Sequence, residues 1–383
     1  MRILIIDIAK YFPGGDNYNE AFHIYDLLIN NNYQVDLFKS IYYDKPRHIH
    51  SIDFKTMLNR RYNIIISMSP QNSSYILKYI KITKNNPKVI ILDRYNFSQF
   101  FIKKPKLFDF KTKSIINKTK KLFPYLQTYF MDDKIGINEL KKIYNINIEY
   151  LQPYINENNF IKDANLLLDD NKKAILFISR VNYKQNSLDL LIDAVKYITK
   201  TKFLEKNNLL IDVTRNGDDL DKFINNIKRK HIEEYFRFIP IMPYDKLPEY
   251  IREHRFSIIV PKEGDSDKII INSMANGVPV LMDRKFNKYS DPYIRSFDRK
   301  TVMFSKVTSS LIKDKENGML FESNNYIDLA EKIMLMISND LTDMKRKAFE
   351  TAIKFTPHKY DQIILLTIKE IIETKDKEII SEI

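Results

Sequence analysis

The chain has 383 residues, of which 44% are hydrophobic. A single core stops growing at about 250 to 300 residues, so a chain of this length and composition is expected to form two packed cores. The absence of cysteine excludes disulfides, thiolate catalysis and cysteine-ligated metals, and it fits a reducing cytoplasm. Every apolar run is far shorter than the roughly 20 residues that span a bilayer, and the N-terminal run reads as a first strand because it has no signal-peptide cleavage site.

The formal net charge is +13, which favours anionic partners such as nucleic acid or an acidic membrane. The chain is rich in Lys, Asn, Ile and Tyr throughout, so we interpret most of this charge as a compositional bias. Lysines do gather in one stretch, Lys103–Lys121, which has eight Lys against one acid, with apolar residues interleaved. This mixture suits lipid head groups or a phosphate backbone, and the alternative is a solvated helix face. The lysines that we assign to an acceptor or membrane surface are Lys103, Lys104, Lys106, Lys111 and Lys113.

In the first half of the chain, short apolar runs alternate with longer amphipathic ones, a pattern typical of βα units and a parallel sheet. The predicted strands are Arg2–Ile8, Gln34–Phe38, Asn63–Met68, Lys88–Leu92 and Tyr125–Met131. The predicted helices between them are Tyr18–Asn31, Ser73–Lys84 and Asn138–Tyr144. We therefore expect a doubly wound α/β domain over residues 1–155.

A polar, irregular stretch at Pro153–Asp163 predicts a linker, and a second α/β series follows it. Its predicted strands are Ala174–Ile178, Leu209–Val213, Phe236–Ile239, Phe256–Val260 and Val278–Met282. Its predicted helices are Ser187–Thr199, Asp219–Lys230, Pro243–His254, Lys268–Asn276, Asn325–Ser338 and Asp343–Lys354. These predict a second Rossmann-like domain over residues 156–356. Residues 357–383, with a helix at Pro357–Thr374, are expected to pack back toward the first domain.

Glycine occurs only seven times in the chain, and five of these residues follow the carboxyl end of a predicted strand. They are Gly14, Gly15, Gly136, Gly217 and Gly264. Open α/β sheets bind ligands beyond these strand ends, where glycine permits a sharp turn or a close approach of the backbone. We therefore expect a cleft between the carboxyl ends of the two predicted sheets.

The run EGDSDKIIINSMANGVPVL, Glu263 to Leu281, joins a buried strand, an acidic loop and a helix that Gly277 ends. Backbone N–H groups at the start of that helix, near Asp267 or Lys268, would point into the cleft and hold a phosphate. Glu263 would present a carboxylate to hydroxyl groups, and Asn272, one turn into the helix, would reach a neighbouring polar group.

The same run resembles the donor-site segment of retaining GT-B glycosyltransferases of the large family 4, in which SMANGVPV, Ser273 to Val280, matches closely. KKAILFISRVNYKQNSLDLLIDAV is similar to the family's strand, Arg, Lys and helix block, and KENGMLFESNNYIDLAEKI to its Asn-Gly block. PGGDNYNEAFHIYDLL resembles the Gly-Gly loop and first helix. The resemblance covers nearly the whole chain.

This resemblance implies a GT-B fold and transfer of a sugar from a nucleotide-sugar, most simply a UDP- or GDP-sugar, without cofactor or metal. It also implies that the domain over residues 1–155 binds the acceptor and the domain over residues 156–356 binds the donor. Arg180 and Lys184 would stabilise the diphosphate leaving group, and Glu263 would contact the sugar, as catalytic residues. In another alignment the family's Lys falls at Asn186. The donor-binding residues implied are Gly14, Gly15, Gly217, Gly264, Asp265, Ser266, Asp267, Lys268 and Asn272.

The sequence departs from the family's pattern at several positions. Ser179 replaces a Gly before the Arg, Asn272 replaces a second Glu at a spacing one residue longer, and DRKFNKYSDPY replaces a second Gly-Gly loop. The expected protein is cytoplasmic, with peripheral membrane contact, and acts on a glycan or lipid-linked acceptor. The alternatives are a glucosyltransferase acting on hydroxymethylated DNA, and a non-catalytic GT-B module that serves as a partner.

Other candidate groups have simpler interpretations. Asp265-Ser266-Asp267 matches the DxD of metal-dependent enzymes, but N-capping by Asp267 accounts for it. Asp218-Asp219 read as helix-start acids. His23, on the helix after the first glycine loop, faces either the cleft or the core.

Overall fold

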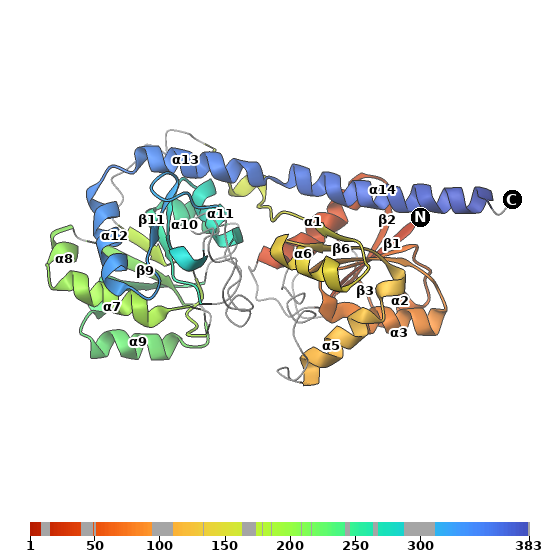
Figure 1. The fold of residues 1–383 in the computed structure, drawn as a ribbon, viewed down its shortest axis with the longest axis horizontal. Coiled ribbons are helices and arrows are strands. Elements are labelled where there is room, and N and C mark those ends of the chain that lie inside the picture. The colour runs from red at the N-terminus through yellow and green to blue at the C-terminus, as the bar shows by residue number, and fades with distance from the viewer. Residues whose placement is uncertain are drawn as a thin grey trace. The chain divides into compact units, whose positions relative to one another are not determined.

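The computed structural model divides into two compact units, drawn in Figure 1. Unit 1 contains Met1–Pro153 and His358–Ile383, and unit 2 contains Tyr154–Pro357. The residues that the structure describes are 1–8, 16–39, 49, 51–93, 110–132, 134–162, 174–177, 179–184, 186–207, 209–215, 217–241, 246–262, 267–286 and 311–381.

Unit 1 contains a parallel sheet of seven strands in the order β3-β2-β1-β4-β5-β6-β7. The strands are β1 (Arg2–Asp7), β2 (Gln34–Lys39), β3 (Ser51–Ile52), β4 (Ile64–Ser67), β5 (Lys88–Asp93), β6 (Leu126–Met131) and β7 (Ile148–Tyr150). The helices of the unit are α1 (Asp16–Asn30), α2 (Phe54–Leu58), α3 (Ser73–Thr83), α5 (Phe110–Lys120), α6 (Lys134–Ile143) and α14 (Pro357–Ser381). β1 pairs with β2 on one side and with β4 on the other, so the strand order reverses between β1 and β4.

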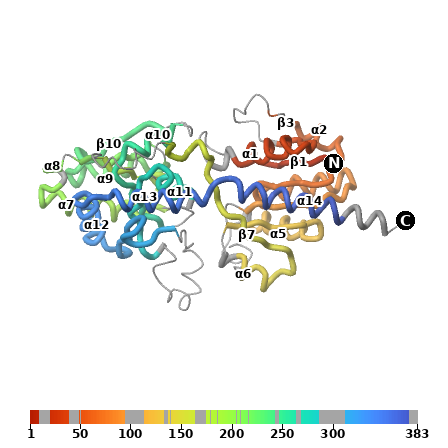
Figure 2. The backbone as a smooth tube through the Cα atoms, turned by 90° about the horizontal axis from the view of Figure 1, so that it is seen from above, coloured from red at the N-terminus to blue at the C-terminus, as the bar shows by residue number. Residues whose placement is uncertain are grey.

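Both faces of this sheet are buried, which explains why its strands read as continuous apolar runs rather than as alternating ones. Leu4 and Ile6 point to the face that α2, α3, α5 and α6 cover. Ile3 and Ile5 point to the opposite face and are also completely buried. α1 contacts β1 and β2, and α14 runs along the same unit (Figure 2).

The contact of α14 with α1 is made by buried and half-buried side chains far apart in sequence. The Tyr360 hydroxyl donates to Glu20 Oε1 at 2.7 Å, and Glu20 is only 2% exposed. One turn along α1, His23 Nε2 lies 2.6 Å from Asp361 Oδ1. His23 therefore faces α14, whereas the sequence left open whether it faces the cleft or the core.

Unit 2 contains a second parallel sheet, of six strands in the order β10-β9-β8-β11-β12-β13. The strands are β8 (Ala174–Phe177), β9 (Leu210–Thr214), β10 (Phe236–Ile239), β11 (His254–Ile259), β12 (Val280–Asp283) and β13 (Gly318–Phe321). The helices are α7 (Leu188–Thr199), α8 (Phe203–Asn207), α9 (Leu220–Arg229), α10 (Leu247–Arg252), α11 (Asp267–Ala275), α12 (Tyr326–Ser338) and α13 (Thr342–Ala352). The order reverses between β8 and β11, which pair directly.

Helices cover both faces of this sheet too. Ile175, Phe177 and Ile211 share a core with α7, α9 and α12. Ile259, Val280 and Met282 share a core with α11 and α13 on the opposite face. The two sheets with their covering helices confirm the predicted fold class, two doubly wound Rossmann-like domains. No helix among the described residues is long and apolar enough to cross a membrane.

Several predicted helices differ from the structure in their bounds: α6 begins at Lys134 rather than Asn138, and α14 extends to Ser381 rather than Thr374. A third difference has a clear tertiary cause. The sequence predicts Pro243–His254, whereas α10 spans Leu247–Arg252 and His254 is the first residue of β11. The His254 ring is completely buried, with Nδ1 2.8 Å from the Tyr250 carbonyl and Nε2 2.9 Å from Asp212 Oδ2. These tertiary bonds hold His254 in the strand, and the local helical pattern carries no sign of them.

Candidate functional site

The site lies where the strand order of unit 2 reverses, at the carboxyl ends of β8 and β11. The loop after β8 carries Arg180 and Lys184, both exposed, and the loop after β11 leads to Glu263. The two loops are joined by backbone: the Ser187 N–H donates to the Val260 carbonyl at 2.7 Å, and Asn186 forms an antiparallel bridge with Pro261. The structure thus places the two predicted cations on one loop, directly beside the segment that precedes Glu263.

Asn186 is turned inward and closes the loop after β8. Its side-chain Nδ2 donates to the Arg180 carbonyl at 2.8 Å, and its backbone N–H donates to the Asn182 carbonyl at 2.9 Å. Only 6% of Asn186 is exposed. Of the two positions for the family's lysine, Lys184 is therefore the one whose side chain is open to a ligand, whereas Asn186 shapes the loop.

Tyr183 stands between the two cations and docks their loop onto α9. Its ring packs against the core of unit 2, its hydroxyl accepts a hydrogen bond from Asn226 Nδ2 at 2.6 Å, and Lys222 Nζ lies 4.2 Å from the ring centroid. Burial raises the pKa of the Tyr183 hydroxyl. The side chain that neighbours Lys184 is thus a fixed anchor.

Gly217 lies under the same loop, after β9. Its φ is +137°, and a Cβ built there would stand 2.3 Å from the Val181 carbonyl oxygen. No residue with a side chain fits this approach without movement of the backbone. Gly217, predicted to bind the donor, therefore supports the Arg180 loop from below.

α11 follows the acidic loop, and its side chains are tied to the start of unit 2. Asn272 is 3% exposed; its Nδ2 donates to the Lys268 carbonyl at 2.9 Å, and its Oδ1 lies 3.4 Å from Asn159 Nδ2. Asn276 Nδ2 donates to the Asn159 carbonyl at 3.0 Å. Lys268, in the first turn, holds its Nζ 5.9 Å from the Tyr154 ring centroid. Asn272 thus helps to hold α11 against the segment around Asn159.

Asp283 is a buried acid at the carboxyl end of β12, the strand next to β11, and sequence reasoning did not single it out. It is 4% exposed, and its Oδ1 accepts hydrogen bonds from the Lys285 N–H at 2.9 Å and from the Ser323 hydroxyl. Burial raises the pKa of its carboxyl, and these two bonds oppose that rise.

Many predicted site residues lie outside the described residues, namely Glu263, Gly264, Asp265, Ser266, Gly14, Gly15, Lys103, Lys104 and Lys106. Asp267 is the first residue of α11 and Lys111 lies in α5, but their side chains are outside the described set as well. The geometry of the site therefore comes from Arg180, Lys184, Gly217, Lys268 and Asn272.

A second polar cluster in unit 2 lies away from this edge. Asp212 is completely buried and accepts hydrogen bonds from Arg237 Nε at 2.7 Å, from the Tyr250 hydroxyl and from His254. Burial opposes ionisation, but these donors outweigh it and hold the pKa of Asp212 well below its usual range. Because His254 begins β11, the cluster lies toward the amino ends of the strands, and we interpret it as part of the core.

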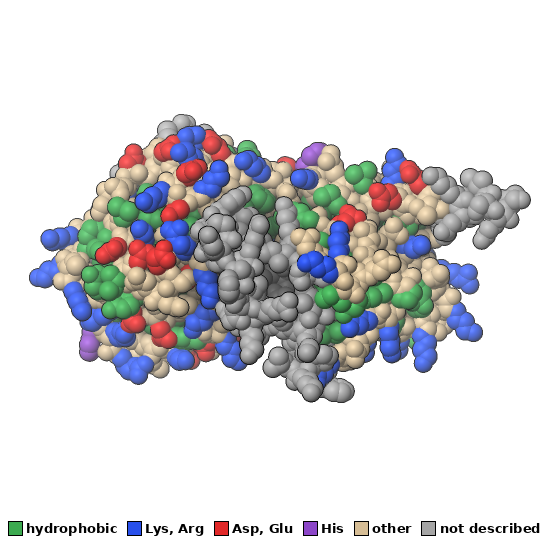
Figure 3. All heavy atoms as spheres, viewed as in Figure 1, with side chains coloured by type: hydrophobic (Ala, Val, Ile, Leu, Met, Phe, Trp, Pro, Cys, Tyr) green, Lys and Arg blue, Asp and Glu red, His purple; other side chains and the backbone are tan. Residues whose placement is uncertain are grey.

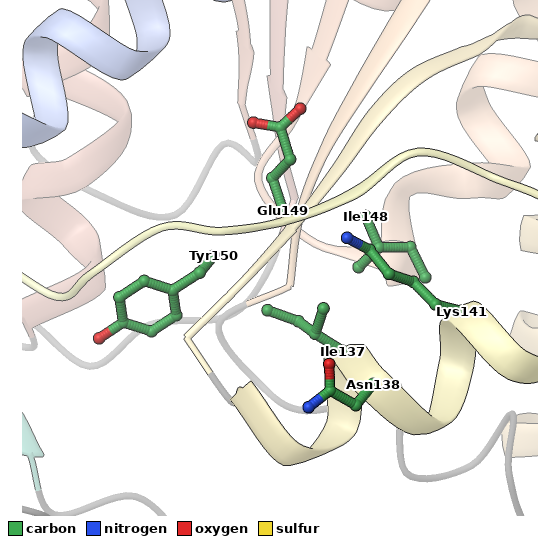
Figure 4. A pocket seen from close by; sticks show the side chains of 6 residues that line it. All are labelled: Ile137, Asn138, Lys141, Ile148, Glu149 and Tyr150. Carbon is green, nitrogen blue, oxygen red and sulfur yellow. The ribbon is translucent and has the colours of Figure 1, made fainter.

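A pocket of about 400 Å³ lies in unit 1, between α6 and the edge strand β7 (Figure 4). It is lined by Ile137, Asn138, Lys141, Ile148, Glu149 and Tyr150. No residue predicted to bind the donor or acceptor is among them.

Comparison with known proteins identifies the first part of the second unit. Residues 158–287 match the family described as Glycosyl transferases group 1, and this range contains Arg180, Lys184, Gly217 and Asn272. Residues 158–287 form a group 1 glycosyltransferase domain. The resemblance predicted from the SMANGVPV run is thereby confirmed, and the chain carries an enzymatic transferase domain. No curated protein matches the chain.

Solved structures show that the group 1 domain sits in a GT-B fold over the whole chain. Sucrose-phosphate synthase from Thermosynechococcus elongatus is 12% identical, with a TM-score of 0.68 over 97% of this chain and 99% of that one. WaaG, a glycosyltransferase involved in lipopolysaccharide biosynthesis, is 13% identical, with a TM-score of 0.66 over 95% and 99%. Anabaena HepE, solved with UDP and glucose, is 12% identical, with a TM-score of 0.65 over 97% and 100%.

Proposed function

We propose that this glycosyltransferase moves a sugar from a nucleoside diphosphate sugar to a hydroxyl of a glycan or lipid-linked acceptor, with retention and without a metal. The observation that supports it is the pair of exposed cations, Arg180 and Lys184, on a loop joined through Asn186 and Pro261 to the segment leading to Glu263. When the sugar leaves, negative charge develops on the diphosphate, and fixed cations at that point stabilise the transition state.

A UDP-sugar is the first donor to test. HepE has been solved with UDP-glucose and shares the fold at 13% identity, with a TM-score of 0.63. WaaB, a lipopolysaccharide outer core galactosyltransferase, is 12% identical, with a TM-score of 0.65. These relatives support a nucleotide-sugar donor and a surface-glycan acceptor as the classes to examine for this chain.

The lysine-rich segment supports an electrostatic acceptor or membrane surface on unit 1. Lys113 lies on α5, and Lys118 and Lys120 on the same helix are exposed, whereas Ile116 is 7% exposed and packs in the core. Of the two apolar side chains of the helix that the structure describes, Ile116 packs in the core and Ile115 is half-buried, so we propose attraction to anionic head groups rather than insertion. Elsewhere, Lys and Arg side chains are spread over the visible face of both units (Figure 3).

The test is acceptor-dependent release of nucleoside diphosphate. The protein is incubated with UDP-, GDP- or ADP-sugars, alone and with a glycan, a lipid-linked sugar or hydroxymethylated DNA. Release that requires the glycan or the lipid-linked sugar supports the proposal. Release only with hydroxymethylated DNA would replace it by the DNA-modifying alternative, and no release from a folded protein would favour a non-catalytic module.

A further inference from the structure

The backbone of Tyr183, between Arg180 and Lys184, is held on both sides by charged side chains from other loops. Its N–H donates to Asp219 Oδ2 at 2.7 Å, and its carbonyl accepts a hydrogen bond from Lys262 Nζ at 3.2 Å. Asp219 follows β9, and Lys262 follows β11 and immediately precedes Glu263. The two peptide groups on either side of the Tyr183 Cα are thus fixed, one by Asp219 and the other by Lys262.

Asp219 does more than begin a helix. It stands at the N-cap of α9, but its carboxylate makes no capping hydrogen bond there. Its backbone N–H donates to the Val181 carbonyl at 3.1 Å, so Asp219 bonds the loop at Val181 and at Tyr183. The Asp219 carboxylate does not cap its own helix but accepts a hydrogen bond from the Tyr183 N–H, 36 residues away. We therefore interpret its position as serving the Tyr183 backbone.

We propose that Asp219 is a positioning residue for the nucleoside diphosphate, which holds Arg180 and Lys184 at the spacing that the two phosphates require. This role rests on the proposed function. Asp219 does not touch the donor; it fixes the Tyr183 backbone, and that backbone fixes the cations on either side. A misplacement of about 1 Å in such a group is enough to lower binding and rate.

A role of Asp219 through its charge and a role through its position predict opposite changes in diphosphate affinity when Asp219 is replaced. If Asp219 acted only through its charge, its removal would strengthen diphosphate binding, because an acid near an anion repels it. If it acts by holding the Tyr183 backbone, Asp219→Ala weakens binding. Asp219→Asn removes the charge but keeps an oxygen that accepts the Tyr183 N–H, and Asp219→Glu keeps the charge but moves the oxygen by one methylene.

The matched control is the neighbouring acid, Asp218. It is exposed, and its Oδ2 lies 3.5 Å from Asn182 Nδ2, which is a weak contact. Asp218→Ala removes the same charge one residue away without releasing the Tyr183 backbone. Its donor affinity should stay within about twofold of the wild type.

The experiment measures UDP, GDP and ADP affinity of the full chain by calorimetry, and the donor KM, beside the thermal unfolding midpoint of each variant. The tightest of the three nucleotides then serves as the probe. We expect Asp219→Ala and Asp219→Glu to bind it about tenfold more weakly, with a raised donor KM and an unchanged acceptor KM, and Asp219→Asn to bind within about twofold of the wild type.

Two results would overturn this role while leaving the proposed function standing. One is wild-type affinity in Asp219→Ala and Asp219→Glu; the other is Asp219→Asn binding as weakly as Asp219→Ala. Should Asp219→Ala not fold, the Asn and Glu variants decide the question by themselves. A wild type that binds none of the three nucleotides would overturn the proposed function and, with it, the role of Asp219.

Discussion

In the loop after β8, Val181 contributes to folding, and its neighbour Arg180 is the residue that we assign to donor binding. Val181 is completely buried in the core of unit 2, whereas the Arg180 side chain is exposed. Because its side chain is exposed, the cation can be removed without leaving a cavity in the core. We therefore expect the loss of the Arg180 side chain to lower activity and to leave stability nearly unchanged.

We expect Arg180→Ala and Glu263→Ala each to lower kcat/KM for the donor by about 100-fold or more, because each removes a group that the proposed mechanism needs at the diphosphate or the sugar. The thermal unfolding midpoint should stay within about 2 °C of the wild type. Arg61→Ala, which removes an exposed Arg from unit 1, is the control and should leave kcat/KM unchanged. Full activity in both site variants would disprove the placement of the donor site.

The buried acid Asp283 gives a prediction about pH. Burial raises the pKa of its carboxyl above the value of about 3.9 in an unfolded chain. The stability that Asp283 contributes is therefore present below that pH, and it is lost as the pH rises through the folded-state pKa. Asp283→Asn keeps an Oδ1 for the Lys285 N–H and the Ser323 hydroxyl but carries no charge.

The free energy of unfolding of Asp283→Asn, minus that of the wild type, should therefore rise between about pH 4 and pH 7. Urea denaturation at a series of pH values measures this difference, in which the other titrating groups cancel. A difference that is independent of pH would show that the Asp283 pKa is not raised by folding.

The site could be predicted from the sequence only in part, because spacing shows which residues are near in the chain and not which loops meet. Arg180 and Lys184 were predicted from their motif, and the structure places both on one loop with exposed side chains. Asp219 and Lys262 were missed as partners of Tyr183, because their bonds to it cross 36 and 79 residues. The Asp218-Asp219 pair after Gly217 was the feature of the sequence that could have indicated this contact, but we interpreted the pair as the start of a helix.

Among the elements, the central strands are the most predictable and the edges the least. β1, β4 and β5 are buried on both faces and therefore appear as continuous apolar runs in the sequence. β3 and β7 lie at the edges of their sheet, contain two and three residues, and were not predicted. In the other sheet, the edge strand β13 was matched as an Asn-Gly block but not as a strand, whereas β10, at the opposite edge, was predicted with its exact bounds. β3 and β7 are short and bury few side chains, so their sequences carry little pattern.

The loop between β9 and α9 gives the prediction at the scale of elements. Gly217→Ala places a Cβ 2.3 Å from the Val181 carbonyl oxygen at a φ of +137°, so the two loops must separate. We expect the free energy of unfolding to fall by about 2 kcal/mol. Donor affinity should fall as well, since the Arg180 loop moves with Val181. Urea denaturation measures the first effect, and a variant as stable as the wild type would contradict the close packing of the two loops.

For the whole molecule, the net charge of +13 raises the question of whether the protein meets an anionic surface by a defined patch or by its overall bias. Lys111→Gln together with Lys113→Gln removes two charges from the lysine-rich segment. If the lysine-rich segment is the surface that binds anionic membranes, binding to vesicles that contain phosphatidylserine should weaken by about 30-fold, at about 1 kcal/mol for each lysine. Lys141→Gln with Lys142→Gln, exposed on α6, is the control, and an equal loss in the two pairs would favour overall bias.

The central claim is that unit 2 binds a nucleoside diphosphate at the carboxyl ends of β8 and β11. The most direct test is the thermal unfolding midpoint of the full chain with UDP, GDP and ADP. A ligand at 100 times its Kd stabilises the folded state by about 2.7 kcal/mol, which for a unit of this size raises the midpoint by about 5 to 10 °C. We predict such a shift with one of the three nucleotides and its loss in Arg180→Ala. No shift with any of them, or the same shift in Arg180→Ala, would contradict the account.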